Sequence, residues 1–270
     1  MPATVPTRAA TPRNPSLAAD ARPWSAERWC GYFEGNTTAW LSSPLHGSAA
    51  LTTSERAAIA DSIAMFQLGE SGGGTHVRRA AAAYVARGGE AAYVQALALF
   101  IAEEQRHGAE LGRFMDAAGL ARWKRCTTDG CFRTLRHTGG LERAIAVLLT
   151  AEVIAQVYYR ALRSATNSSW LRALCTRILR DEVAHIAFQA ERLALLRRSR
   201  GPCARAWRNA LQRVLFAGAV SWVYSTHGRC LRAGGFPLRR FWRSCWSRYR
   251  MAHARWNAPH IQHKLNSRNE

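Results

Sequence analysis

Residues 103–107 have the sequence EEQRH, and residues 181–185 have the sequence DEVAH. In each stretch the second acid of an acidic doublet is followed three residues later by a histidine, and these doublets are the only adjacent acidic pairs among the 18 acids of the chain. Residues i and i+3 share one face of an α-helix, so the Glu and His of each motif can bind one metal ion from the same side. The two motifs are Glu104-x-x-His107 and Glu182-x-x-His185.

The composition predicts a globular, all-α protein. The chain has 270 residues, of which 48% are hydrophobic, enough for a sizeable core. Long segments rich in Ala, Leu and Arg repeat with a period of about 3.6 residues, whereas few alternate with period two. The longest apolar run, Val214 to Tyr224, is too short to span a bilayer, so we do not expect a transmembrane protein.

Helix signals divide the chain. Thr52-x-x-Glu55 is a capping box and predicts a helix running to Glu70, where Gly72 to Gly74 interrupt the pattern as a kink, a break or a π-bulge. The pattern resumes over 77–86. Further helices are predicted at about 90–118, from after Gly140 to about 164, and from the turn and cap at 167–169 to about 198.

The predicted helices place four glutamates at similar depths. Glu70 and Glu104 lie about 17 and 15 residues from the turn that separates their helices, and Glu152 and Glu182 lie about 13 and 14 residues from theirs. In antiparallel hairpins the mismatch is about one helical turn or less. All four carboxylates can therefore meet at one level.

One Glu followed by Glu-x-x-His, occurring twice, resembles the pattern of the ferritin-like superfamily of di-iron carboxylate proteins, which includes rubrerythrins, bacterioferritins and di-iron oxygenases. The resemblance covers about residues 52–198. It implies a ferritin-like four-helix bundle that holds two iron ions, with Glu104 and Glu182 as bridging, catalytic carboxylates and Glu70 and Glu152 as terminal ones. The metal ligands that it implies are Glu70, Glu104, His107, Glu152, Glu182 and His185.

Physical chemistry supports a metal at such a cluster. Four carboxylates in an apolar bundle need counter-charge, and two divalent cations supply it. Glutamate and imidazole suit iron or manganese, and a mixed iron/manganese pair also fits. The preceding acids, Glu103 and Asp181, are placed to hold the opposing His rings, whereas Arg106 and Arg180 are expected to face outward. Tyr159 either approaches the metals or packs in the core.

The rest of the chain divides into two regions. Residues 1–23 are predicted to be a disordered tail, with a transit peptide as the alternative, and residues 24–198 form the bundle. Residues 199–270 are a basic, Trp-rich extension with two additional C-terminal helices, at 202–233 and 237–257. From Arg197 onward the chain has sixteen Lys and Arg and one acid, within a net charge of +20.

The basic region has three interpretations. Residues 197–268 bind an anionic membrane surface, bind nucleic acid, or form a packed helical pair whose Arg-rich face is solvated. The seven cysteines show no CxxC spacing, which favours free thiols and a cytoplasmic location, with peripheral membrane attachment as the variant that the basic region adds.

The motifs favour a di-iron oxidase or oxygenase that uses dioxygen and an electron donor to oxidise a small organic substrate. A ferroxidase, for which iron itself is the substrate, is the first alternative. The second is a nucleic-acid or membrane-binding protein whose metals are structural. The substrate, the electron donor and the formation of a homodimer stay open at this level.

Overall fold

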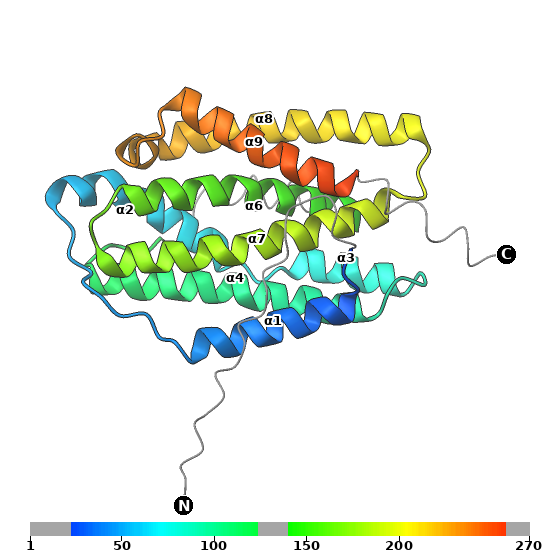
Figure 1. The fold of residues 1–270 in the computed structure, drawn as a ribbon, viewed down its shortest axis with the longest axis horizontal. Helices are drawn as coiled ribbons and strands as arrows, with labels where there is room; N and C mark the ends of the chain where they lie inside the picture. Colours follow the sequence, from blue (N-terminus) through cyan, green and yellow to red (C-terminus); the bar gives the residue numbers. More distant parts are fainter. Residues whose placement is uncertain (1–22, 124–139, 258–270) are drawn as a thin grey trace, which may run out of the picture.

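The structure, a computed structural model, describes residues 23–123 and 140–257, and every regular element in these ranges is an α-helix (Figure 1). The prediction of an all-α fold is therefore confirmed. In chain order the helices are α1 (Ala26–Leu41), α2 (Thr53–Glu70), α3 (Thr75–Val85), α4 (Ala92–Ala117), α6 (Leu141–Ser164), α7 (Ser169–Arg197), α8 (Pro202–Ala233) and α9 (Leu238–Trp256).

Local sequence signals set most helix ends where they were predicted. The capping box forms at α2, since Glu55 N donates to Thr52 Oγ1 at 3.2 Å and Thr52 N donates to Glu55 Oε2 at 2.8 Å. Pro202 stands at the first turn of α8, where its missing N–H costs nothing. The predicted helices after residue 90 agree with α4, α6, α7, α8 and α9 to within about two residues at each end.

The glycine run at residues 72–74 is a helix break. Helix α2 ends at Glu70, and Gly74 has a φ of +60°, a conformation that side chains rarely adopt. A Cβ on Gly74 would lie 2.6 Å from Ile101 Cδ1 on α4, so this position also lacks space for a side chain. The break leaves Glu70 as the last residue of its helix and lets α3 start in a new direction.

Helices α2, α4, α6 and α7 form the centre of the protein. Helix α2 packs on α4, α4 packs on α7, and α6 and α7 pack against each other as neighbours along the bundle (Figure 1). Helix α6 is long and apolar enough to cross a membrane by length and composition, but 83% of that window is buried inside the protein. A buried core helix meets the same criteria of length and composition, so α6 is weak evidence for a membrane span.

Helix α1 was not predicted from the sequence. Its segment GNTT at residues 35–38 consists of poor helix formers, so local propensity does not favour a helix there. Tertiary packing decides instead: α1 lies on α4 and buries Trp29, Phe33 and Trp40. Its ring neighbours include the imidazole of His185, 6.1 Å from the Phe33 ring, so α1 covers the region of the two motifs.

The C-terminal helices pack on the bundle. Helix α8 lies on α6 and α2, and α9 lies on α7 and α6, so the two form a layer along one side of the molecule (Figure 1). Phe216, Leu231, Phe241 and Cys245 are fully buried in the same core cluster as the bundle helices. Residues 199–257 therefore share one core with residues 24–198. The predicted disordered tail, apart from residue 23, and residues 258–270 lie outside the described ranges.

A buried carboxylate ties three distant helices together. Glu191 on α7 accepts hydrogen bonds from Trp29 Nε1 on α1, at 2.9 Å, and from the backbone N of Trp24, at 3.1 Å. Its other oxygen forms an ion pair with Arg255 on α9. Both side chains of this pair are about 4% exposed or less, so neither charge has water as an alternative partner.

We expect Glu191→Ala to lower the free energy of unfolding by about 3–5 kcal/mol, because it removes the buried carboxylate that pairs with the buried charge of Arg255. Urea denaturation followed by circular dichroism measures the change. Glu34→Ala removes an exposed carboxylate from α1 and is expected to change stability by no more than about 0.5 kcal/mol. Equal stability of the two variants would contradict the role assigned to Glu191.

Candidate metal centre

The structure brings the six predicted residues together between four helices. Two groups of side chains have candidate donor atoms within 4.8 Å of one another, and they share Glu104. Glu70 comes from the end of α2, Glu152 from α6, and the two motifs from α4 and α7. The first group is Glu70, Glu104 and His107, and the second is Glu104, Glu152, Glu182 and His185.

The cluster lies in the protein interior. Glu182 and both histidines are fully buried, Glu152 and Glu70 are 4% and 9% exposed, and the side chain of Glu104 is the most exposed, at 16%. On the inner side, His185 Nδ1 lies 2.8 Å from Glu104 Oε1 and 3.8 Å from Glu152 Oε2, while His107 Nδ1 lies 3.8 Å from Glu104 Oε1. The Nδ1 atoms of both rings therefore face the carboxylates.

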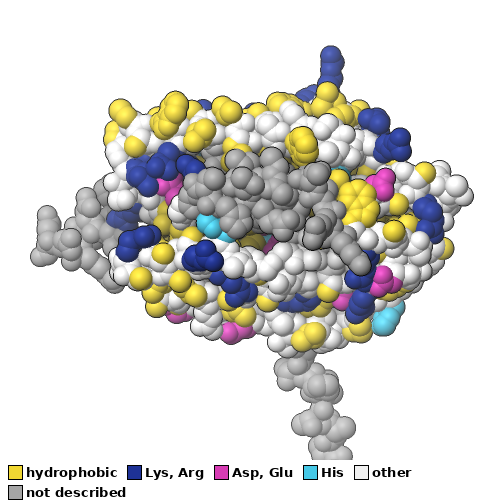
Figure 2. Space-filling model, turned by 180° about the vertical axis from the view of Figure 1, so that it is seen from behind, with side chains coloured by type: hydrophobic (Ala, Val, Ile, Leu, Met, Phe, Trp, Pro, Cys, Tyr) yellow, Lys and Arg dark blue, Asp and Glu magenta, His cyan; other side chains and the backbone are white. Residues whose placement is uncertain are grey.

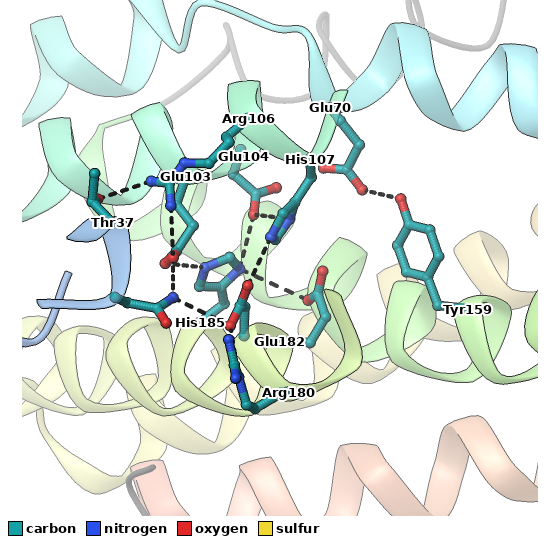
Figure 3. A network of polar contacts seen from close by, with 12 residues as sticks. Thr37, Glu70, Glu103, Glu104, Arg106, His107, Tyr159, Arg180, Glu182 and His185 are labelled. Carbon is teal, nitrogen blue, oxygen red and sulfur yellow. Dashed lines mark hydrogen bonds and ion pairs between the residues drawn. The ribbon is translucent and has the colours of Figure 1, made fainter. Parts of the chain in front are cut away.

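The outer nitrogens of the two rings contact acids in a crossed arrangement (Figure 3). His107 Nε2 lies 3.2 Å from Asp181 Oδ2, and His185 Nε2 lies 3.0 Å from Glu103 Oε2. Each acid precedes the opposite motif, as the sequence predicted. With a proton held at Nε2 by its acid, each ring presents the lone pair of Nδ1 to the cluster, which is the form that binds a metal ion.

Asn36 on α1 joins the two outer acids and was missed by the sequence analysis. Its side-chain nitrogen donates to Glu103 Oε1 and, at 3.2 Å, to Asp181 Oδ1, and the residue is only 3% exposed. The prediction had no helix in this segment, so nothing placed Asn36 near the motifs. One asparagine thus fixes the acids that hold both imidazole rings.

The two arginines beside the motifs differ in their exposure to solvent. Arg106 was predicted to face outward, but its side chain is only 15% exposed, and its guanidinium donates to Thr37 Oγ1 at 2.9 Å and lies 3.8 Å from Glu103. This prediction was wrong because α1, which covers Arg106, was not foreseen. Arg180 is 44% exposed, and its Nε lies 3.4 Å from Asp181 Oδ1. Each outer acid therefore has a cation beside it.

The inner atoms of the cluster need a further partner. Among the described residues, His107 Nδ1 and both carboxylate oxygens of Glu182 are buried without a hydrogen bond, and His185 Nδ1 and Glu104 Oε1, which lie 2.8 Å apart, have no hydrogen-bond partner beyond each other. Most buried polar atoms in proteins have such a partner. Metal ions would satisfy all of these atoms at once, so the donors present fit a metal site.

The pKa values of the cluster are shifted because its acids are buried close together without counter-charge. Burial, and then the charge of Glu104, raises the pKa of Glu70 well above its usual value. Burial, and then Glu152, does the same to Glu182. For His185 burial lowers the pKa, but the surrounding carboxylates outweigh it and raise the pKa overall. The cluster therefore attracts positive charge.

Tyr159 contacts the cluster instead of merely packing in the core. Its hydroxyl donates to Glu70 Oε1 at 2.6 Å, and the ring is fully buried (Figure 3). Burial, and then Glu70, raises the pKa of Tyr159, so the phenol keeps its proton near neutral pH. Glu70 also offers a candidate donor atom within 4.8 Å of those of Glu104 and His107.

A cavity of about 180 Å³ reaches the carboxylates from the side of α2, α6 and α8. Glu70, Glu104 and Glu152 form its polar end. His227 of α8 lies on its wall, where Ser62 Oγ is 2.9 Å from His227 Nδ1 and burial lowers the His227 pKa to about 4. The rest of the lining is mainly apolar and comprises Met65, Phe66, Gly69, Val147, Leu148, Ala151, Ile154, Ala155 and Val223.

The sequence analysis missed the contribution of α8 to this wall. It treated the C-terminal helices as an addition to the bundle, and Val223 and His227 belong to no motif that points to a cavity. The only signal was the apolar run that contains Val223. The sequence did not show which helices this run packs against; the structure places α8 on α2 and α6.

Comparisons of the chain with protein-family models, with curated proteins and with solved structures found no match. The structure itself shows an all-helical protein with a buried Glu and His cluster that can bind metal. The function is therefore argued from the geometry of this cluster and of the cavity beside it.

The glycine after His107 makes room for the end of α2. A Cβ on Gly108 would lie 2.7 Å from Ser71 Oγ and 3.1 Å from the carbonyl carbon of Glu70, both part of the C-terminal end of α2. We expect Gly108→Ala to displace Glu70 from His107 and to weaken the binding of one metal ion by roughly tenfold or more. Calorimetric titration of metal-free protein with Co²⁺ measures the affinity.

Gly112→Ala is the matched control one turn further along α4. A Cβ there meets only the end of the Arg122 side chain, which is partly exposed and can move. The gain in helix propensity is expected to leave this variant as stable as the wild type or up to about 1 kcal/mol more stable, with unchanged Co²⁺ binding. Metal affinities that agree between the two variants would rule out the proposed contact with α2.

Proposed function

We propose that the protein is a ferritin-like di-iron carboxylate oxidoreductase, an oxidase or oxygenase, that uses dioxygen to oxidise a small organic substrate. The observation that carries the proposal is the apolar cavity that ends on Glu70, Glu104 and Glu152. A metal site that only balances charge or stabilises the helix bundle needs no apolar cavity beside it. A site that oxidises an organic molecule needs it next to the metals.

The donor set supports iron as the metal. The two groups offer carboxylate oxygens and imidazole nitrogens, with no thiolate among them. Such ligands suit iron or manganese, and a mixed pair is compatible with the same set. Two ferrous ions bound there would supply the electrons that activate dioxygen.

Each protein group has a role that its position supports. Glu104 belongs to both groups, which favours a bridging role; Glu182 belongs to one, and its bridging role is part of the proposal. Glu103 and Asp181 keep the imidazole Nδ1 atoms directed at the metals. Tyr159 orients Glu70 through its hydroxyl.

The cavity constrains the substrate. Its volume of about 180 Å³ is below the roughly 300–1,000 Å³ of pockets for drug-sized ligands, and its walls are mainly apolar. A small, largely apolar molecule fits. In an oxygenation, one oxygen atom enters a C–H bond of the substrate, and the other leaves as water after a donor delivers two electrons and two protons. We propose the electron donor only by its chemical class, a reductant that delivers two electrons.

A ferroxidase is the second candidate, because the doubled Glu-x-x-His set also resembles that of the bacterioferritins. An acid-lined cavity for mineral does not accompany it in the described residues. The acids that line the cavity beside the cluster are the cluster's own.

The first test is an anaerobic titration of metal-free protein with ferrous iron, followed by exposure to oxygen in an optical spectrometer. We expect saturation near two ions per chain and an absorption band that cycles with added reductant. Glu104→Ala removes the residue that both groups share and is expected to abolish the band, whereas Asp116→Ala, at an exposed position of the same helix, should retain it.

Other outcomes assign other functions. Iron uptake far beyond two ions per chain would favour the ferroxidase. Failure to bind iron, manganese or cobalt would refute the metal centre itself.

A second variant tests the role of the cavity. Ala155 lies one turn after Glu152 and lines the cavity, so Ala155→Phe fills space that the substrate needs. We expect unchanged metal stoichiometry but at least about a tenfold loss of oxidation in a screen of small apolar substrates, measured as product formed per oxygen consumed. Ala102→Phe, on an exposed face of α4, is the control. A cavity-filled variant as active as this control would disprove the assigned substrate site.

A further inference from the structure

The face of α8 that points away from the bundle carries an apolar stripe. Trp207, Leu211, Val214 and Trp222 are 71%, 53%, 70% and 46% exposed. Their spacings of four, three and eight residues place them within one sector of the helix. Figure 2 shows hydrophobic side chains along the upper edge of the molecule, the level at which α8 lies in Figure 1, with Lys and Arg side chains near them.

This exposure is concentrated in the C-terminal helices. Among the large hydrophobic side chains that are exposed in the described part of the chain, Leu41 alone precedes residue 200. Leu238 and Met251 of α9 complete the set. Exposed Trp and aliphatic side chains gathered on one helix face mark an interaction surface.

The C-terminal region that carries the stripe is strongly basic. Residues 197–257 contain fourteen arginines and no acidic residue. Arg239, Arg243 and Arg250 stand on the exposed face of α9 and line an open hollow together with Arg160 of α6 and two tryptophans. Within the described ranges none of these four arginines has a carboxylate at ion-pair distance.

The arginines of the hollow also repel one another. Burial, and then the charges of Arg248 and Arg163, lowers the pKa of Arg160. Like charges held together without acids favour a ligand that brings several negative charges.

We propose that the outer faces of α8 and α9, called the docking face below, bind the surface of an anionic phospholipid membrane. The stripe of α8 enters the boundary between headgroups and acyl chains, and the arginines contact the lipid phosphates. Trp and Arg suit this boundary because one end of each side chain is apolar and the other polar. The proposal does not depend on the chemistry at the metal centre.

Two other partners fit the docking face less well. A second copy of the chain would bring arginines against arginines with no acid on either helix, a repulsive pairing. Nucleic acid is held by positive charge and by aromatic stacking, neither of which uses the exposed aliphatic side chains of Leu211 and Val214. A lipid surface uses both the charge and the aliphatic stripe.

The test is co-sedimentation of the full-length, metal-loaded protein with vesicles of phosphatidylcholine alone or mixed with phosphatidylserine. We expect binding to the mixed vesicles only. The triple variant Trp207→Ser, Leu211→Ser, Val214→Ser and the triple variant Arg239→Gln, Arg243→Gln, Arg250→Gln are each expected to weaken binding by roughly tenfold or more. All six positions are exposed, so the melting temperature should not change.

Matched controls distinguish vesicle binding by the docking face from binding caused by net charge or by any exposed apolar side chain. Leu41→Ser removes an exposed apolar side chain from α1, and Arg78→Gln, Arg79→Gln, Arg172→Gln removes three exposed arginines elsewhere. Both controls should bind mixed vesicles as the wild type does. Equal loss in the arginine control would attribute binding to net charge and overturn the proposal.

Three further results would also overturn it. The first is failure of the wild type to bind mixed vesicles, and the second is unchanged vesicle binding by the Trp207, Leu211, Val214 variant. The third is salt-sensitive binding of the wild type to single-stranded DNA, if the docking-face variants lose this binding but still bind vesicles. The last of these would assign the face to nucleic acid.

Discussion

The crossed contacts between the outer acids and the two imidazoles are the interaction on which the centre of this protein depends. Asp181 holds His107 and Glu103 holds His185, so each histidine of one helix is fixed by an acid of the other. These contacts link α4 to α7 through fully buried charged groups, which tolerate little displacement. The register of the two helices and the inward direction of both Nδ1 atoms follow from the same pair of contacts.

Other parts of the fold serve the same charged centre. Asn36 reaches the outer acids only because α1 lies across α4, and α1 is anchored at its other end by the contact of Trp29 with Glu191. Gly108 lets the end of α2 approach α4, and Tyr159 then fixes the orientation of Glu70. A buried cluster of acids thus imposes requirements on side chains that are not candidate ligands, and on α1, which carries no candidate ligand, because each inner and outer oxygen needs a partner of its own.

The sequence predicted what local rules control. Spacing of three residues placed Glu and His on one face, and the capping box fixed the start of α2, since both depend on residues within one turn. Helix α1 escaped prediction because its segment GNTT disfavours a helix locally and tertiary contacts, chiefly with α4, stabilise it. Asn36, the position of Arg106 and the cavity wall at His227 were missed for the same reason: each depends on which helix lies beside which, and that follows from the whole core.

Helix α8 has two faces with different surroundings. Val223 and His227 line the cavity that ends at the carboxylates of the cluster, whereas Trp207, Leu211 and Val214 lie on the opposite, exposed side. Trp222, the exposed residue next to Val223, lies one helix diameter, about 10 Å, from the cavity side, whereas Trp207, Leu211 and Val214 lie roughly 14–30 Å further along the helix axis. If the exposed side rests on a lipid surface, a small apolar substrate concentrated in that lipid lies close to the cavity wall. If both proposals hold, the apolar cavity and the apolar outer stripe of α8 would serve the same kind of substrate, one that partitions from water into membrane.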